Sequence, residues 1–267
     1  MSFVEITRPD PQVAVITLNR PERMNAMAFD VMVPFREHLI DLGHDNSIRA
    51  IVLTGAGRGF CSGADQESAG KPPHVEGLTR PTYALRSMEA LDAIVLTLRR
   101  LHQPVIAAVN GAAIGGGLCL ALACDIRVAG QEAYFRAAGI NNGLTASELG
   151  LSYLLPRAIG SSRAAEIMLT GRDVAAAEAE RIGLVSEVAD DVVARAVEIG
   201  QRIARFSQPG VELTKRTLVN GLDASSIEGH MAAEGLGQLY LRILTDNFEE
   251  STRARKEKRE PRFTDTR

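Results

Sequence analysis

The chain contains no tryptophan and only three cysteines among its 267 residues. Cys61, Cys119 and Cys124 are odd in number and lack the paired spacing of zinc ligands, which excludes a disulfide framework and argues against a zinc site. The five histidines share no ligand spacing either, so we expect no bound metal. The cysteines lie in apolar segments, and we expect them to be reduced core residues.

The charge of the chain is nearly balanced, with a formal net value of −3. Such a balance gives no general attraction to nucleic acid or to an anionic membrane, so any phosphate must be recognised by a local basic patch. Long apolar runs free of glycine and charge are missing, and the first residues resemble a strand rather than a signal peptide. We therefore expect a cytoplasmic protein with no membrane span and no nucleic-acid partner.

A hydrophobic content of 45% in a chain of this length can bury a large core, in one domain or in one domain with a helical appendage. Alternating or β-branched runs predict strands at 13–18, 50–54 and 105–109. Apolar residues at spacings of three and four predict helices at 28–42 and 82–101. Strands that alternate with helices indicate an α/β fold.

The second half of the chain has a different pattern. The segment 70–77 carries two prolines and two glycines without periodicity and is expected to be a mobile loop. Beyond Arg157 the pattern predicts almost only helices, at 161–169, 174–181, 190–206, 210–220 and 227–244. A helical layer should therefore follow the α/β core.

The most informative segment extends from Pro104 to Asp125. An apolar strand leads into three glycines, Gly115–Gly117, and directly into a helix rich in alanine and leucine. Unpaired N–H groups and the positive end of the helix dipole favour negative charge, and the glycines let a ligand approach the main chain. Such a place can form half of an oxyanion hole.

A second glycine-rich turn, at 55–65, follows the strand at 50–54. It is not a dinucleotide fingerprint, because Phe60 stands where the third glycine would be needed. Together with the segment 18–26, the two glycine-rich segments resemble the enoyl-CoA hydratase/isomerase (crotonase) superfamily over most of the chain. The resemblance implies a crotonase-like ββα spiral core at 1–200 and a C-terminal helical trimerisation region at 201–267.

The same resemblance assigns the two oxyanion donors to the backbone N–H groups of Ala64 and Gly116. The carbonyl oxygen of an acyl-CoA thioester would lie between them, and each donor contributes roughly 3–4 kcal/mol when aimed at developing enolate charge. The alternative is that both segments are ordinary strand-to-helix turns. No other cofactor is implied, since the CoA thioester is the substrate.

Hydratases of this family use two glutamates as general base and acid. Their positions align here with Cys119 and Gly139, neither of which can handle a proton as a carboxylate does. The sequence therefore argues against two-glutamate hydration.

One acid remains nearby, in the segment 143–150. Counting back from Arg157 places Glu148 on the single acid of some family isomerases, whereas counting forward from Phe135 places Ser147 there. We prefer the backward count, since its anchor is nearer. A lone carboxylate can move a proton between carbons of an enoyl thioester. Alternatively, Glu148 is a solvent-facing acid at the start of a helix, where the dipole favours it.

Further residues are implied as contacts of CoA. These are Arg23, the backbone at Ala26 and Ser62, and Lys258 and Phe263 in the basic C-terminal run, which in the family often act from a neighbouring subunit. By contrast, two other acids are expected to be structural: Asp65 to brace its turn and Asp125 to pair with backbone or an arginine.

These features predict an acyl-CoA enzyme with enoyl-CoA isomerase-like or weak hydratase activity, assembled as a homotrimer or hexamer. The alternatives are thioester hydrolysis at the same oxyanion hole and a catalytically silent acyl-CoA-binding protein. The acyl chain length and the pathway depend on pocket shape rather than on any motif.

Overall fold

The computed structural model describes residues 2–266 and contains two β-sheets. The larger sheet has the order β1-β2-β3-β5-β7-β10, and its strands are Val4–Asp10, Val13–Leu18, Ala50–Gly55, Val105–Val109, Ile126–Gly130 and Glu187–Ala189. The smaller sheet has the order β4-β6-β8-β9, with strands Gly59–Cys61, Ala112–Ile114, Tyr134–Arg136 and Val174–Ala175. Only the β1·β2 and β8·β9 pairs are antiparallel.

From β3 to β8, successive strands alternate between the two sheets. The units β3-β4-α2, with α2 at Arg80–Arg100, and β5-β6-α3, with α3 at Gly116–Ala123, each give one strand to either sheet before a helix. The β7-β8 pair continues the pattern toward α4, Leu151–Ile159. This arrangement confirms the predicted crotonase-like ββα spiral.

Both faces of the central strands β2, β3 and β5 are buried, which explains why these strands read as continuous apolar runs. Along β2, Ala14 and Ile16 face the main core, while Val13 and Val15 face a second core against α7, Val192–Ala204. The other helices of this part of the chain are α1 (Phe29–His44), α5 (Ser161–Thr170) and α6 (Ala176–Arg181).

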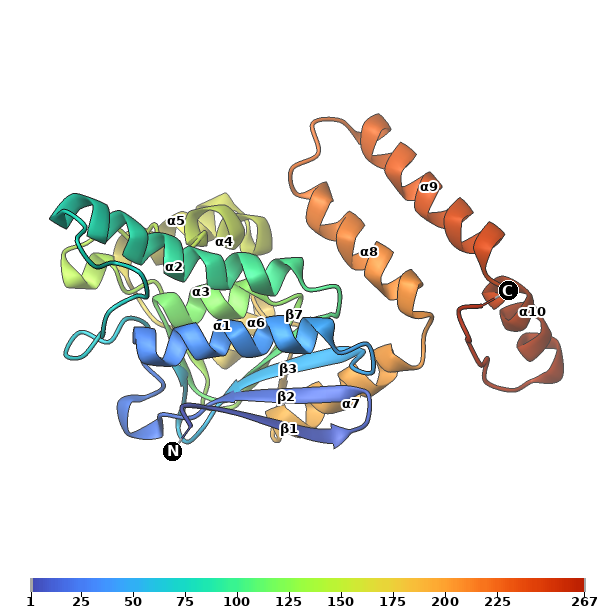
Figure 1. Cartoon of the computed structure of the whole chain (residues 1–267), viewed down its shortest axis with the longest axis horizontal. Coiled ribbons are helices and arrows are strands. Elements are labelled where there is room, and N and C mark those ends of the chain that lie inside the picture. Colours follow the sequence, from blue (N-terminus) through green and yellow to red (C-terminus); the bar gives the residue numbers. More distant parts are fainter. Residues whose placement is uncertain (1, 267) are drawn as a thin grey trace.

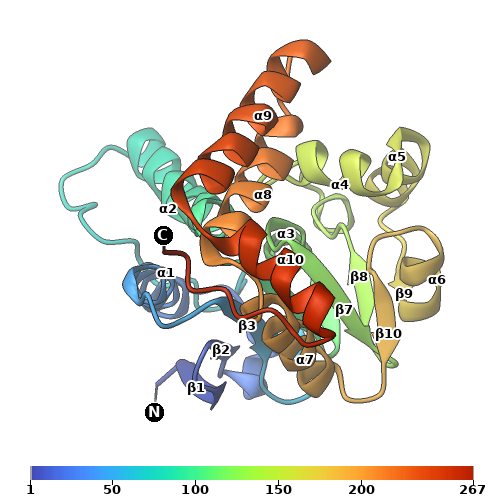
Figure 2. The same cartoon turned by 90° about the vertical axis from the view of Figure 1, so that its right-hand side faces the viewer.

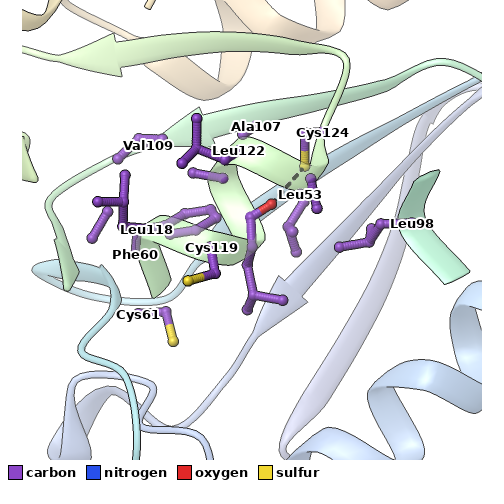
Figure 3. Packing of buried hydrophobic residues seen from close by; sticks show 14 of the residues in the cluster. Leu53, Phe60, Cys61, Leu98, Ala107, Val109, Leu118, Cys119, Leu122 and Cys124 are labelled. Carbon is purple, nitrogen blue, oxygen red and sulfur yellow. Dashed lines mark hydrogen bonds between the residues drawn. The ribbon is translucent and has the colours of Figure 1, made fainter. Parts of the chain in front are cut away.

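Helix α3 lies at the centre of the main core. All eight of its residues are buried, which fits its lack of a polar face. Figure 3 shows Leu118 and Leu122 of this helix among Leu53, Phe60 and Val109 from the surrounding strands. Helix α3 is therefore held in place by its packing against the strands.

The C-terminal helices form an arm beside the core (Figure 1). They are α8, Gln208–Gly221, α9, Ile227–Leu244, and α10, Asn247–Glu257. A buried Lys215 on α8 donates to Asp125 (2.7 Å) and to the carbonyl of Gln103 (2.8 Å), which ties the arm to the core. Asp125 thus has the predicted structural role, since it also accepts the backbone N–H of Val105 (2.8 Å), and its charged partner is a lysine rather than an arginine. Within residues 2–266, no helix is long and apolar enough to cross a membrane.

Four expectations needed correction. The predicted turn at 55–65 contains β4, and the predicted helix at 174–181 begins with strand β9, so α6 starts only at Ala176. Strand β10 lies in the half expected to be almost wholly helical, and the end of α10 forms from the run at 253–263, which was identified only as basic. Strands of two or three residues carry too little alternation to be recognised, and a highly charged helix has no apolar stripe.

Candidate active site

The start of α3 requires glycine. Strand β6 ends at Ile114, and Gly115 then turns the chain with φ 53° and ψ −117°, a conformation that a side chain disfavours. A Cβ on Gly116 would lie 2.3 Å from Sδ of Met27. A Cβ on Gly117 would lie 2.0 Å from the carbonyl oxygen of Cys61. Each position of the triplet therefore requires glycine for a different structural reason.

The second glycine-rich segment packs directly on this helix start. Gly63 has φ 83°, and a Cβ there would lie 2.7 Å from the Ile114 carbonyl oxygen and 3.3 Å from the Gly116 nitrogen. The residue that follows it is Ala64. The fold thus brings together the two segments that the sequence assigned to the oxyanion donors.

Neither of the two N–H groups predicted as donors has an acceptor among the described residues. Met27 forms a parallel bridge with Ala64, in which the Met27 N–H donates to Gly63 (2.7 Å) and the Met27 carbonyl accepts from Asp65 (3.1 Å). This pairing leaves the Ala64 N–H without an acceptor, and Gly116, as first residue of α3, also has none in the described part of the chain. Two adjacent free N–H groups are what an oxyanion requires.

Glu148 lies next to the same helix start. Its Oε1 is 3.2 Å from the position of a Cβ on Gly115. The side chain is half-buried, and this burial raises the pKa of the Glu148 carboxyl above its ordinary value. Raising the pKa makes the ionised carboxylate a stronger base.

The backbone around Glu148 is strained. Leu149 has φ 47° and Gly150 has φ 79°, so two consecutive residues are left-handed, which is rare for a buried leucine. The Glu148 carbonyl accepts from Leu151 N–H (2.8 Å) and from the Cys119 thiol (3.5 Å), which holds the turn. Nothing in the sequence indicated that Leu149 would adopt this left-handed conformation.

Ser147 occupies a different environment. It is exposed, and its N–H donates to the Thr145 hydroxyl (3.0 Å). Of the two residues that the alignment left open, Glu148 is the one whose side chain lies beside the glycine triplet.

Neither position aligned with a hydratase glutamate offers an acid. Cys119 is buried, and this burial holds the pKa of its thiol well above the ordinary value. A Cβ on Gly139 would lie 2.0 Å from the carbonyl oxygen of Thr145, so the loop leaves no room for a side chain there. Burial also raises the thiol pKa of Cys61 and Cys124 to about 12, so neither is a nucleophile near neutral pH.

Asp65 is structural, as predicted. Its carboxylate has no exposed surface and accepts from Arg20 and Arg23 (both 2.9 Å). It also accepts the backbone N–H groups of Glu67 (3.0 Å) and Ser68 (2.9 Å). The hydrogen bond from Arg23, together with these backbone bonds, holds the pKa of Asp65 well below its usual range. No sequence pattern indicated the role of Arg20, because this contact joins residues 45 positions apart.

The residues implied in CoA binding fall into two groups. Arg23, Ala26 and Ser62 lie near Ala64, but the N–H groups of Ala26 and Ser62 donate to the carbonyls of Arg23 (3.1 Å) and Met24 (3.0 Å). Any contact of these two backbones with a ligand must therefore use their carbonyl oxygens.

The other two implied residues, Lys258 and Phe263, lie at and beyond the end of α10. Figure 1 shows α10 at the far end of the arm, away from α3. The structure therefore does not bring them to the glycine triplet within one chain. Among the described residues, no cluster of three or more histidine, cysteine and acidic side chains could hold a metal ion.

Known proteins share the whole architecture. The family model for enoyl-CoA hydratase/isomerase matches residues 9–266. A probable enoyl-CoA hydratase of Mycobacterium tuberculosis is 72% identical, covering 99% of this chain and 94% of that protein. A mevalonyl-coenzyme A hydratase of Aspergillus fumigatus is 34% identical, with 97% and 93% covered.

Two solved structures are similar as well. A probable enoyl-CoA hydratase/isomerase from Mycobacterium abscessus superposes with a TM-score of 0.95 at 69% identity, over the full length of both chains. A monofunctional enoyl-CoA isomerase from M. smegmatis has a TM-score of 0.74 at 64% identity, covering 86% of this chain and 99% of that one. With a spiral fold, paired glycine turns and these relatives, the chain belongs to the enoyl-CoA hydratase/isomerase family and is an enzyme of that family.

Proposed function

We propose that this chain is an enoyl-CoA isomerase, which moves the double bond of a 3-enoyl-CoA to the 2-position with Glu148 as the single acid–base group. The observation that carries the proposal is the position of the Glu148 carboxylate beside Gly115, at the start of a helix whose first N–H is free. A base and an oxyanion site on one substrate are the minimum that such an isomerase needs.

The reaction follows from this geometry. The thioester oxygen accepts from the N–H groups of Ala64 and Gly116, and the Glu148 carboxylate removes a proton from C2. The electron pair of the broken C–H bond moves into the carbonyl, and the two N–H groups stabilise the resulting dienolate. Glu148 then returns the same proton to C4, so that the double bond lies between C2 and C3 and no atom is gained or lost.

Hydration would need a second proton-handling group to activate water. Cys119 is a buried thiol and Gly139 has no space for a side chain, so Glu148 would have to act without a partner. Hydration is therefore the weaker activity. The relative named an isomerase supports the main reaction, although other close relatives are named as hydratases.

The same proposal includes the CoA site and the assembly. Arg23 and the carbonyls of Ala26 and Ser62 contact the CoA of their own chain, whereas Lys258 and Phe263 reach the CoA of a neighbouring subunit in a homotrimer or hexamer. The arm supports this assembly, because α9 buries none of its residues and leaves Ile227 78% and Leu236 70% exposed. The CoA thioester is the substrate, no further cofactor takes part, and the enzyme acts in the cytoplasm.

An assay of the wild-type protein separates the possible reactions. Purified protein is incubated with trans-2-enoyl-CoA and with cis- and trans-3-enoyl-CoA of several chain lengths, while double-bond migration, water addition and release of free CoA are followed separately. Migration faster than hydration is the expected result. Dominant hydration, release of free CoA, or binding without turnover would each contradict it and would favour a hydratase, a thioesterase or a silent binder respectively.

A further inference from the structure

A cavity of about 210 Å³ lies between the core and the first helix of the arm. Its walls are the C-terminal ends of α2, α3, α4 and α8 together with the start of β7. Figure 2, which views the core from the side of the arm, shows α8 between α2 and α4. The cavity reaches the surface at Leu218 of α8, which is 70% exposed. Because a water molecule occupies about 30 Å³, the space suits a ligand of roughly seven or eight non-hydrogen atoms.

Three arginines line this cavity without an acidic partner. Arg99, Arg127 and Arg157 form no ion pair within residues 2–266. The carboxylate of Asp125 also belongs to the lining, but it is already bound to Lys215 (2.7 Å). Positive charge in the lining therefore exceeds negative charge, which favours an anion.

The surroundings of Arg127 show the effect of this excess. Its Nε donates to the Leu184 carbonyl (2.6 Å) and its Nη1 to the Cys124 carbonyl (3.1 Å), whereas Nη2 has no acceptor in the described part of the chain. Burial lowers the pKa of the Arg127 guanidinium, and the charge of Arg99 adds to this effect while that of Asp125 opposes it. An anion bound near Arg127 and Arg99 would offset the repulsion between them.

The helix ends at this cavity offset part of the positive charge. The C-terminal end of an α-helix carries roughly half a negative charge, so the four ends amount to about two negative charges. Asp125 and Lys215 cancel each other. The three guanidinium groups therefore leave roughly one positive charge unmatched. This remainder matches a monoanion better than a dianion such as phosphate.

The rest of the lining is mainly apolar. Its apolar residues are Leu122, Leu154, Ala158, Leu218, Val219 and Leu222. A small hydrated anion would leave these side chains without a partner, whereas a hydrocarbon chain would be buried against them. The cavity thus combines a place for one negative charge with a place for a short alkyl chain.

Two polar contacts hold α8 against the core beside the cavity. Lys215 binds Asp125, and Asp223, which follows α8, accepts from the Tyr153 hydroxyl of α4. The guanidinium carbon of Arg157 lies 3.6 Å from the centroid of the Tyr153 ring, so this arginine is held by stacking. The walls are therefore in place before a ligand binds, which lowers the entropic cost of binding.

The cavity is separate from the proposed oxyanion site of the same chain. That site lies at the first residue of α3, Gly116, whereas the cavity is lined by Leu122 near the end of the helix. The helix spans roughly 12 Å at about 1.5 Å per residue. A ligand of the cavity therefore does not occupy the position of the thioester.

We propose that this cavity binds a short-chain aliphatic carboxylate of about six carbons, with its carboxylate on Arg99, Arg127 and Arg157 and its alkyl chain against the leucines. Guanidinium groups bind carboxylates in bidentate fashion, which gives the charged end a defined orientation. The inference does not depend on the isomerase reaction.

Calorimetric titration of the full chain tests the proposal. The probes are hexanoate, 1-hexanol and inorganic phosphate, so that the chain and the charge are also tested separately. They are measured on the wild type and on the double variant Arg99→Gln/Arg157→Gln. The double variant Arg80→Gln/Arg163→Gln is the control, because it removes the same charge at two exposed arginines that form no ion pair among the described residues.

Two further measurements do not depend on the arginine variants. Ala158→Leu keeps every charge and fills part of the apolar wall. Titration of the wild type with hexanoate in the presence of saturating hexanoyl-CoA shows whether hexanoate binds instead in the proposed catalytic site.

We expect hexanoate to bind at least about tenfold more tightly than hexanol or phosphate. Its Kd should rise about tenfold or more in Arg99→Gln/Arg157→Gln and about fivefold or more in Ala158→Leu, and should change less than about twofold in the control and with hexanoyl-CoA. No binding of hexanoate, equal affinity in both double variants, tighter binding of phosphate, or displacement of hexanoate by hexanoyl-CoA would each overturn the proposal.

Discussion

The Oε1 atom of Glu148 lies 3.2 Å from the point that a Cβ on Gly115 would occupy. A carboxylate can approach the start of α3 this closely because Gly115 has no side chain. The free N–H of Gly116 is the next donor along the chain. This relationship places the proposed base and the proposed oxyanion donor around the same small volume, and the predictions below follow from it.

The pH dependence of the reaction should report Glu148. Only the ionised carboxylate can accept a proton, and burial raises the pKa of this group above the ordinary 4.5. We expect kcat/KM for double-bond migration to fall as the pH is lowered through this raised pKa. Measurement of kcat/KM between pH 4 and 8 checks this. An activity that is constant down to pH 4 would show that Glu148 is not the base.

The stability of the folded chain should also depend on the ionisation of Glu148. Activity should increase as the pH rises, whereas this contribution to stability should decrease. Because the pKa of Glu148 is higher in the folded chain than in the unfolded chain, the folded chain binds the proton more tightly. The stabilisation is complete below the unfolded value and is lost as the pH rises through the folded value. Urea unfolding from pH 4 to 7 should therefore show a relative gain for Glu148→Gln over the wild type as the pH rises. Parallel curves for the two proteins would contradict the shift.

The glycine triplet allows a matched pair of substitutions. In Gly116→Ala the new Cβ meets the flexible Met27 side chain, but in Gly117→Ala it meets the Cys61 backbone carbonyl. We expect Gly116→Ala to fold with a loss of about 1 kcal/mol and Gly117→Ala to lose about 3 kcal/mol or more. Urea unfolding measures both effects.

Activity then separates the two variants further. Displacement of the donor in Gly116→Ala should lower kcat by about 10²-fold. The added substitution Met27→Ala, which makes room for the new Cβ, should restore part of it. Equal stability losses in the two single variants, or no rescue by Met27→Ala, would show that these contacts do not position the donor.

Introducing the two glutamates of the hydratases at positions 119 and 139 should not produce hydratase activity, because position 139 has no room for a side chain. A side chain on Gly139 meets the Thr145 carbonyl at 2.0 Å, so Gly139→Glu must displace the loop that leads to Glu148. We expect Cys119→Glu/Gly139→Glu to gain no hydratase activity and to lose migration activity about 10²-fold or more. Both reactions are followed on trans-2- and trans-3-enoyl-CoA. A variant that hydrates well would show that this loop is not an obstacle.

The sequence predicted the parts of the fold that have strong local patterns. Strands β2 and β5 and helix α9 begin and end at the predicted residues, because their apolar runs or periodicities are long. The three-residue strands β4, β6 and β8 were missed, since a strand of this length is specified by its neighbours rather than by its own residues. Helix α10 was missed because more than half of its residues are charged and it has no apolar stripe.

The sequence motifs of the site could be predicted, but the spatial arrangement of its residues could not. The family-like glycine motifs pointed to Ala64 and Gly116 as the proposed donors, but a single uncertain gap left Glu148 and Ser147 as alternatives. The left-handed backbone at Leu149, which aims the Glu148 turn, has no sequence signal because leucine rarely adopts it. The Arg20–Asp65 ion pair joins segments that are distant in the sequence, and no local sequence pattern predicts such a contact.

The most direct test of the central role of Glu148 compares Glu148→Gln with its neighbour variant Ser147→Ala. The amide keeps the size of the side chain but cannot accept the proton. We expect Glu148→Gln to lose double-bond migration by about 10³-fold while still binding CoA thioester, and Ser147→Ala to remain within about twofold of the wild type. Full migration activity in Glu148→Gln, or its loss in Ser147→Ala alone, would contradict the assignment of Glu148 as the acid–base group.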